Sequence, residues 1–345
     1  MTGCKKNRAT PLWVGVALAG LLTGPTEAAS KAFELALPIR CTPGQDCFVQ
    51  NYFDRDSGVS WRDFACGKLS YDGHAATDFR LRSLRQMAQG VEVLAAAAGT
   101  VGGIRDGEPD VSIRRRPLAP DDKKQAGNAV RIDHGDGWAT QYSHLQKGSV
   151  RVRPGQRVNA GEVLGRVGLS GKTEFPHLDF GVRKDGQSVD PFAPDAAVGC
   201  GQMAAPLWSP PVARALAYLP SGILQAGFAD RMLSTEEVEA GDRFLNVLAT
   251  TAPAIVFQVE VFGPRAGDVE AISLLDPIRR TLAEDRQTVD RDQAVRRVYI
   301  GKRRARSDWV PGTYVGKYVL RRAGVVVVET VLPIELLLSG SPAPR

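Results

Sequence analysis

The chain has 345 residues, 43% of them hydrophobic and 24% charged, and a formal net charge of +6. A chain of this length is expected to hold about two domains. Its positive charge is not gathered into long basic runs interleaved with aromatic residues, which argues against a nucleic-acid-binding protein. After the first 30 residues no segment is apolar over the roughly 20 residues that cross a bilayer, so we expect no integral membrane segment there.

The first segment in chain order has the layout of a secretory signal peptide. A basic start at residues 5–8 precedes an apolar run at residues 12–22, and small residues follow. The apolar run is too short for a membrane anchor, which is the alternative interpretation. We therefore expect residues 1–30 to be a signal peptide, cleaved after Ala28 or Ser30, and the protein to be exported to the periplasm or cell envelope.

Four cysteines remain after this segment: Cys41, Cys47, Cys66 and Cys200. An even number of cysteines in an exported chain indicates two disulfides, for which three pairings exist. We predict Cys41–Cys47, which closes a short turn, and Cys66–Cys200, which ties the two ends of the next region together. A zinc–thiolate site is the alternative, but these cysteines lack the close paired spacing of such sites.

Short apolar runs separated by glycine-containing turns characterise residues 31–203, and this pattern predicts a mostly antiparallel β domain. The expected strands lie at residues 91–98, 128–132, 138–145, 157–167 and 177–182. A polar insertion at residues 106–125 interrupts them and is either a functional rim or a solvated loop. The proline-rich residues 204–214 should not lie inside a helix or strand, and we interpret them as a linker.

The remaining residues, 215–345, predict a second β domain. Runs of strand length lie at residues 256–262, 294–300, 313–320 and 325–332. The last two runs, joined by a turn at Gly324, resemble the final hairpin of an immunoglobulin-like β-sandwich. This region has no histidine or cysteine, so we interpret it as an accessory domain. The fold class predicted for the whole chain is mainly β.

Histidine is the most informative residue type in this chain. All four histidines fall within about a hundred residues of the first domain: His74, His134, His144 and His177. No metal-ligand spacing involves His134, which we interpret as structural or groove-lining.

Two short patterns have the spacing of a metal site. On a strand, alternate residues point the same way, so His74 and Asp78 should share one face, and so should His177 and Asp179. If these strands are neighbours, the two pairs and His144 converge on one patch. Such a patch can hold a divalent cation with three protein ligands and leave one position open for water.

The ordered motifs resemble the lysostaphin/LytM-type zinc metalloendopeptidases. The resemblance covers about residues 70–192 and is carried by Gly73-His74-x-x-x-Asp78, Gly127-Asn128 through His134-Gly135, Thr140-x-Tyr142-x-His144-Leu145, the Gly155 to Gly165 segment, and Pro176-His177-Leu178-x-Phe180. Members of that family cut peptide bonds in bacterial peptidoglycan cross-links. The resemblance implies an antiparallel sheet whose groove carries a metal ion.

Carried over residue by residue, the resemblance implies that His74 and Asp78 are metal ligands and that His144 and His177 are catalytic. The third ligand in the family is the second histidine of a His-x-His pair, and Asp179 stands at that position here. Carboxylate is an acceptable zinc ligand. The resemblance implies that the ion is zinc. A second aspartate should raise the pKa of the bound water and favour harder ions, which makes manganese the alternative.

Three functions are compatible with these patterns. The first is a metal-dependent endopeptidase acting on stem or bridge peptides of peptidoglycan, with Tyr142 on the face of His144 helping to position the substrate. The second is a degenerate LytM-like module that binds the cell wall or regulates another hydrolase, as the departure at Asp179 suggests. The third makes residues 215–345 the main functional part, presenting a surface to other envelope proteins.

Overall fold

The computed structural model describes residues 1–3, 32–119, 122–202 and 205–338. Glu34–Arg345 is one compact unit. The predicted signal peptide, apart from its first three residues, lies outside the described residues. In the described part, no helix combines the length and the apolar character that a membrane span needs.

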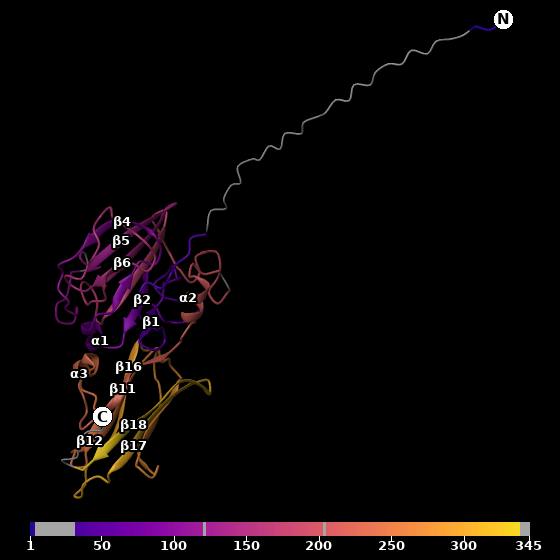
Figure 1. The fold of residues 1–345 in the computed structure, drawn as a ribbon. Coiled ribbons are helices and arrows are strands. Elements are labelled where there is room, and N and C mark those ends of the chain that lie inside the picture. Colours follow the sequence, from indigo (N-terminus) through magenta and orange to yellow (C-terminus); the bar gives the residue numbers. More distant parts are fainter. Residues whose placement is uncertain (4–31, 120–121, 203–204, 339–345) are drawn as a thin grey trace. The chain divides into compact units, whose positions relative to one another are not determined.

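One eight-stranded antiparallel sheet contains the histidine motifs (Figure 1). Its order is β1-β2-β9-β6-β5-β4-β7, with β10 paired to β9. The strands are β1 (Cys47–Asn51), β2 (Thr77–Leu81), β4 (Gly99–Arg105), β5 (Asn128–Gly135), β6 (Trp138–Leu145), β7 (Arg157–Val158), β9 (His177–Lys184) and β10 (Gln187–Val189). Because β9 lies between β2 and β6, motifs that are about a hundred residues apart in sequence become neighbours.

Three predicted strands, at residues 128–132, 138–145 and 177–182, are confirmed as β5, β6 and β9. The run at 157–167 is instead divided into β7 and β8 (Val163–Arg166), because a turn with Gly161 at φ 82° separates them. Only β3 (Glu92–Leu94) forms within the run at 91–98, and it pairs with β8 in a separate two-stranded sheet.

Strand β1 has no counterpart among the predicted strands, whereas β2 overlaps the end of residues 74–78, which were expected on a strand. Their residues are buried on both faces, apart from the partly buried Asn51. Strand β1 has no regular alternation of apolar and polar residues. Strand β2 alternates from Asp78 to Leu81, and Asp78 lies on a strand as expected.

The C-terminal region is a two-sheet sandwich that shares one apolar core. One sheet has the order β11-β13-β16 and the other β12-β18-β17-β14-β15. Their bounds are β11 (Gly222–Ala229), β12 (Val247–Ala249), β13 (Ala254–Phe262), β14 (Val269–Leu275), β15 (Thr281–Thr288), β16 (Val295–Arg303), β17 (Gly312–Arg322) and β18 (Val325–Leu337). Phe257 and Tyr318, from opposite sheets, are fully buried in this core.

The predicted final hairpin is present as β17 and β18, with Gly324 at φ 83° in its turn. The immunoglobulin-like assignment and the domain boundaries stay predictions.

The expectation that prolines exclude regular structure from residues 204–214 is wrong. Helix α2 (Pro210–Ala215) begins there, because proline at the first helical positions lacks only an N–H that would have no partner within the helix. Trp208, just before it, is 3% exposed and contacts the Phe180 ring at 5.7 Å. The other two helices of the described residues are α1 (Leu84–Gln89) and α3 (Thr235–Ala240).

Both predicted disulfides, Cys41–Cys47 and Cys66–Cys200, are present. The second bond joins residues 134 positions apart and anchors the loop between β1 and β2. Arg55 of that loop reinforces the attachment by donating to the carbonyl oxygens of Ala193 (2.6 Å) and Val198 (2.6 Å). The segment that enters the histidine site is therefore held at several points.

The sandwich packs directly on the eight-stranded sheet. The Tyr218 hydroxyl donates to the buried Asp63 at 2.8 Å, and the rings of Phe48 and Phe262 lie 5.4 Å apart.

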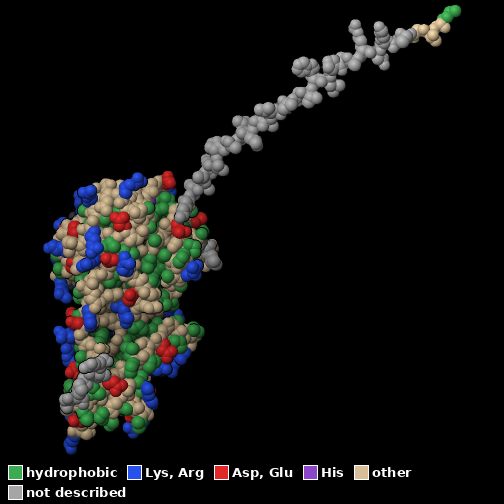
Figure 2. Space-filling view, in the orientation of Figure 1, with side chains coloured by type: hydrophobic (Ala, Val, Ile, Leu, Met, Phe, Trp, Pro, Cys, Tyr) green, Lys and Arg blue, Asp and Glu red, His purple; other side chains and the backbone are tan. Residues whose placement is uncertain are grey.

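On the face shown in Figure 2, basic and acidic side chains are interspersed. The positive net charge is thus not concentrated on that face.

Candidate active site

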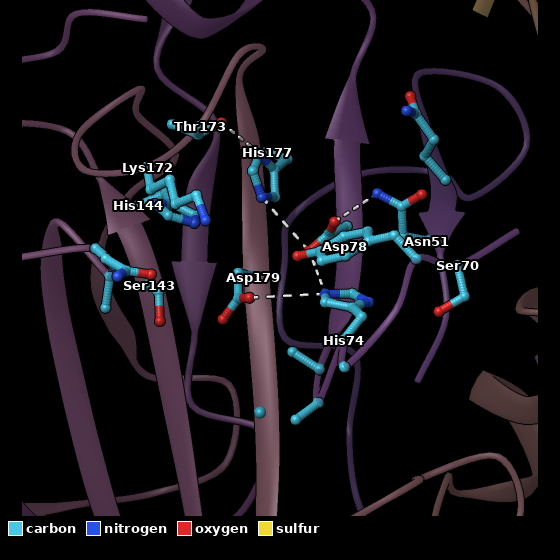
Figure 3. A pocket seen from close by; sticks show the side chains of 18 of the residues that line it. Asn51, Ser70, His74, Asp78, Ser143, His144, Lys172, Thr173, His177 and Asp179 are labelled. Atoms are coloured by element: carbon cyan, nitrogen blue, oxygen red, sulfur yellow. Dashed lines mark hydrogen bonds and ion pairs between the residues drawn. The ribbon is translucent and has the colours of Figure 1, made fainter. Parts of the chain in front are cut away.

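Four of the predicted site residues come from three adjacent strands (Figure 3). Asp78 on β2 pairs across the strands with Asp179 on β9. His177 is the first residue of β9, and His144 lies near the end of β6. All four side chains line the same cavity, because β2, β9 and β6 are neighbours in the sheet.

His74 reaches the site from a loop, and the expectation that it lies on a strand is wrong. Strand β2 begins only at Thr77. The preceding residue, Gly73, adopts φ 74°, a conformation that favours glycine, and its N–H donates to Asp54 at 3.0 Å. This turn, rather than strand alternation, brings His74 beside Asp78.

All three site histidines present the same ring nitrogen to the cavity. Each has Nδ1 within hydrogen-bond distance of a backbone carbonyl oxygen: His74 to Tyr52 (2.9 Å), His144 to Ser170 (2.7 Å) and His177 to Phe175 (2.9 Å). A carbonyl oxygen only accepts, so Nδ1 carries the proton and, in the neutral ring, Nε2 has a free lone pair. This is the arrangement that prepares an imidazole to bind a metal or accept a proton.

His74, Asp78 and Asp179 offer ligand atoms that all lie within 4.8 Å of one another. His74 Nε2 is 3.2 Å from Asp78 Oδ1 and 3.9 Å from Asp179 Oδ2. His74 Nε2 and Asp78 Oδ1 are both buried and have no hydrogen-bond partner among the described residues. Two lone pairs that face each other in a buried site need a cation between them, and the donor set suits a divalent metal.

The electrostatics of the metal-free cluster lead to the same conclusion. Burial lowers the pKa of His74, but the carboxylates of Asp78 and Asp179 outweigh it and raise the pKa to about 10. Burial raises the pKa of Asp78, yet His74 and His177 outweigh it and hold that pKa well below its usual range. Without a metal, a proton on His74 therefore supplies the positive charge that the cluster needs.

His144 and His177 form a pair whose ring centres are 4.7 Å apart. Burial, and then the neighbouring His177, lower the pKa of His144 to about 4. Burial also lowers the pKa of His177, but the charge of Asp78 outweighs it and the net shift is upward. The pKa values of the two neighbouring rings are therefore shifted in opposite directions.

Tyr142 does not line the cavity, contrary to its expected place on the face of His144. Its hydroxyl accepts from the Ala96 N–H at 2.7 Å, and its ring packs in the core 5.3 Å from Phe180. The alternation fails because His144 adopts φ 62°, which turns its side chain off the regular strand pattern.

His134 is structural, with Nδ1 bonded to the Ala98 carbonyl oxygen at 2.8 Å.

Two residues beside the cluster had no signal in the sequence. Asn51 Nδ2 donates to Asp78 Oδ2 at 2.7 Å, which leaves Oδ1 directed at the histidines (Figure 3). The Tyr71 ring stacks on His74 at 4.4 Å. Asn51 pairs with Asp78 only through the unpredicted strand β1, so no local pattern could have revealed it.

The site lies in a cavity of about 850 Å³, within the usual range for ligand-binding clefts. Ile113 and Gln125 contribute to its wall, so the polar insertion at residues 106–125 is a rim and not only a solvated loop. The Ile113 N–H donates to the Thr173 carbonyl oxygen at 2.9 Å, which attaches this rim beside His177.

Residues 74–191 match the family model described as Peptidase family M23. This range contains all five metal-motif and catalytic-motif residues: His74, Asp78, His144, His177 and Asp179.

Three curated bacterial proteins are similar to the same part of the chain. The cell division protein DipM of Caulobacter vibrioides is 32% identical over 119 residues, which are 34% of this chain and 18% of that protein. The DD-carboxypeptidase/endopeptidase Mpg of Neisseria meningitidis serogroup B is 43% identical over 67 residues, 19% and 15% of the two chains. The murein hydrolase activator EnvC of Escherichia coli is 35% identical over 100 residues, 29% and 22% of the two chains. The chain thus spans about a fifth of the length of these relatives, and residues 74–191 form a Peptidase family M23 domain of the LytM type.

Proposed function

We propose that the protein is a metal-dependent endopeptidase that hydrolyses peptide cross-links or stem peptides of bacterial peptidoglycan. The observation that carries the proposal is the buried, unpartnered pair His74 Nε2 and Asp78 Oδ1, placed beside the two histidines of the catalytic motif. The relative Mpg, whose name describes a DD-carboxypeptidase/endopeptidase, supports the reaction class.

In this proposal, His74, Asp78 and Asp179 hold one divalent ion, zinc or alternatively manganese. When bound, such an ion polarises a carbonyl oxygen and lowers the pKa of water at the site. Asn51 orients Asp78 through the 2.7 Å hydrogen bond, and the Tyr52 carbonyl oxygen fixes the ring of His74. These two supports keep both ligands directed at the cavity.

His144 and His177 would have different tasks in the hydrolysis. Neutral His144 would accept a proton from the attacking water at Nε2 and pass it to the departing amine nitrogen as the C–N bond breaks, while His177, when protonated, would donate a hydrogen bond from Nε2 to the scissile carbonyl oxygen as charge develops there. The opposite pKa shifts of the two rings support this assignment. The hydrogen bonds of their Nδ1 atoms to Ser170 and Phe175 hold both rings in position.

Zinc affinity should rise with pH. The pKa of His74 is about 10 in the metal-free site, so below that pH the ion must displace a proton from Nε2. We expect the affinity to increase by up to about tenfold per pH unit from about pH 7 to pH 9 and to level off above pH 10. Competition with a chelating dye of known pH dependence measures this slope. A flat profile would show that His74 is not a ligand.

Digestion of isolated peptidoglycan sacculi tests the function. Zinc-loaded protein should convert cross-linked muropeptides into monomers and expose one new amine for each bond cut, as chromatography and amine labelling would show. Removing the metal with a chelator should stop the release, and adding zinc should restore it. Intact sacculi after incubation with protein that holds one zinc ion would contradict the proposal.

The second candidate is a degenerate M23 module that binds the wall or regulates another hydrolase. The name of the relative EnvC, a murein hydrolase activator, favours it. The three metal-motif residues and the two catalytic-motif histidines all line one cavity, and this favours the enzyme. A surface that only binds the wall or another protein does not need metal ligands and catalytic histidines together. Either function implies export to the periplasm or cell envelope, with residues 215–345 available to other envelope proteins.

A further inference from the structure

The cavity that contains the metal cluster, here called the metal groove, continues into a side pocket of about 100 Å³. Trp61 and Asn51 line both spaces. The C-terminal region contributes Arg265, Asp292 and Gln293 to the lining of the side pocket. The pocket is therefore built jointly by residues 50–70, which precede the M23 domain, and by the C-terminal region.

Trp61 is held in place although it is partly in solvent. It is 38% exposed, which is high for so large an apolar side chain. Lys68 Nζ lies 5.3 Å from the centre of its ring and donates to its carbonyl oxygen at 2.9 Å. The next residue, Arg62, donates its N–H to the buried Asp54 at 3.0 Å. A fixed and partly exposed tryptophan at the end of a groove offers a preformed contact surface.

The lining of the side pocket also offers hydrogen-bonding groups. Asp292 uses Oδ1 to accept from the Ala266 N–H at 2.9 Å, and its Oδ2 has no partner among the described residues. The amide of Gln293 and Oδ1 of Asn51 likewise form no hydrogen bond with the part of the chain that the structure describes. The lining of the side pocket thus combines an aromatic ring with polar groups that have no hydrogen-bond partner among the described residues.

We propose that this side pocket binds an N-acetylated amino sugar of the glycan strand while the metal groove holds the attached peptide. The C–H groups of a pyranose ring carry partial positive charge and pack on the negative face of an aromatic ring, while hydroxyl and acetamido groups need nearby amides and carboxylates. A peptide side chain would favour an enclosed apolar pocket instead. Besides Trp61, the apolar side chains of the lining are Leu69, Pro264 and Ala294, and Leu69 is only 6% exposed.

This inference rests on the proposed function, and it gives the sandwich a role in substrate binding. The probe is an N-acetylglucosamine tetramer, which contains no peptide chain, and calorimetry on the intact chain measures its binding. Trp61→Ala should weaken binding by at least about tenfold, since truncating a buried aromatic contact commonly costs that much. Gln293→Ala should also weaken it. Absence of tetramer binding to the parent protein, or unchanged binding by Trp61→Ala, would overturn the proposal.

Trp138→Ala is the matched control. Trp138 also has a lysine over its ring, Lys184 at 5.6 Å, but it lines neither the metal groove nor the side pocket. This variant should bind the tetramer like the parent, and both tryptophan variants should bind zinc normally. Loss of tetramer binding in Trp138→Ala as well as in Trp61→Ala would indicate a general effect on the fold and count against the side pocket.

Cleavage assays separate a sugar from a peptide in this pocket. Because Trp61 also lines the metal groove, Trp61→Ala should slow digestion of sacculi by a larger factor than hydrolysis of a glycan-free cross-linked peptide. Equal losses on both substrates would mean that Trp61 binds peptide, and the inference would be wrong. Protein that cuts neither substrate but binds the tetramer through Trp61 would contradict the endopeptidase and retain the glycan site.

Discussion

Replacing His74 with alanine should lower zinc affinity by more than about 100-fold and abolish wall cleavage. Residues that only orient a metal ligand contribute about 10- to 100-fold to metal affinity, so loss of a ligand itself should exceed that range. Asp78→Ala should behave in the same way, because it removes the oxygen 3.2 Å from His74 Nε2. Chelator competition measures the zinc affinity, and muropeptide chromatography measures the cleavage.

His134→Ala is the matched control for His74→Ala. It also removes an imidazole that bonds to a backbone carbonyl, but His134 lies outside the metal groove. We expect it to bind zinc and cut sacculi like the parent, apart from lower thermal stability. Parent-like zinc affinity in His74→Ala would show that the ion is held elsewhere or not at all.

Two substitutions of Asp179 should have opposite effects. Its carboxylate is 22% exposed and lies 3.9 Å from His74 Nε2, so Asp179→Ala should leave two ligands and reduce both zinc affinity and cleavage to background. Asp179→His should retain zinc and remove one negative charge from the site. The pKa of water at the ion should then fall, and cleavage near neutral pH should rise several-fold.

The same pair of variants decides between the enzyme and the degenerate module. A working aspartate ligand requires activity in the parent that Asp179→Ala removes. An inactive parent whose Asp179→His variant cuts sacculi would show that this position has lost a ligand, and the regulatory function would then be preferred. Asp185→Ala, which removes an exposed carboxylate close to the end of β9, serves as the control for charge alone.

Features that depend on short-range patterns could be predicted from the sequence. Strands β5, β6 and β9 have apolar runs bounded by turns. The even cysteine count indicated two disulfides, and the structure has the pairing that we predicted among the three possible ones. The clustering of the histidines and the order of their motifs indicated a metal site and its family before any coordinates. Residue type and spacing suffice here because the ligands are few and chemically distinctive.

Only the tertiary structure decided how these groups meet. Strand order placed β9 between β2 and β6, and a loop turn at Gly73 brought His74 to the site. The positive φ of His144 turned its side chain into the cavity, while Tyr142 stayed on the core face of β6. Asn51 and Trp61 became part of the site through chain segments with no periodic pattern. Strand pairing and loop packing join residues that are distant in sequence, and the free energy of those contacts depends on the whole fold, so no local pattern encodes them.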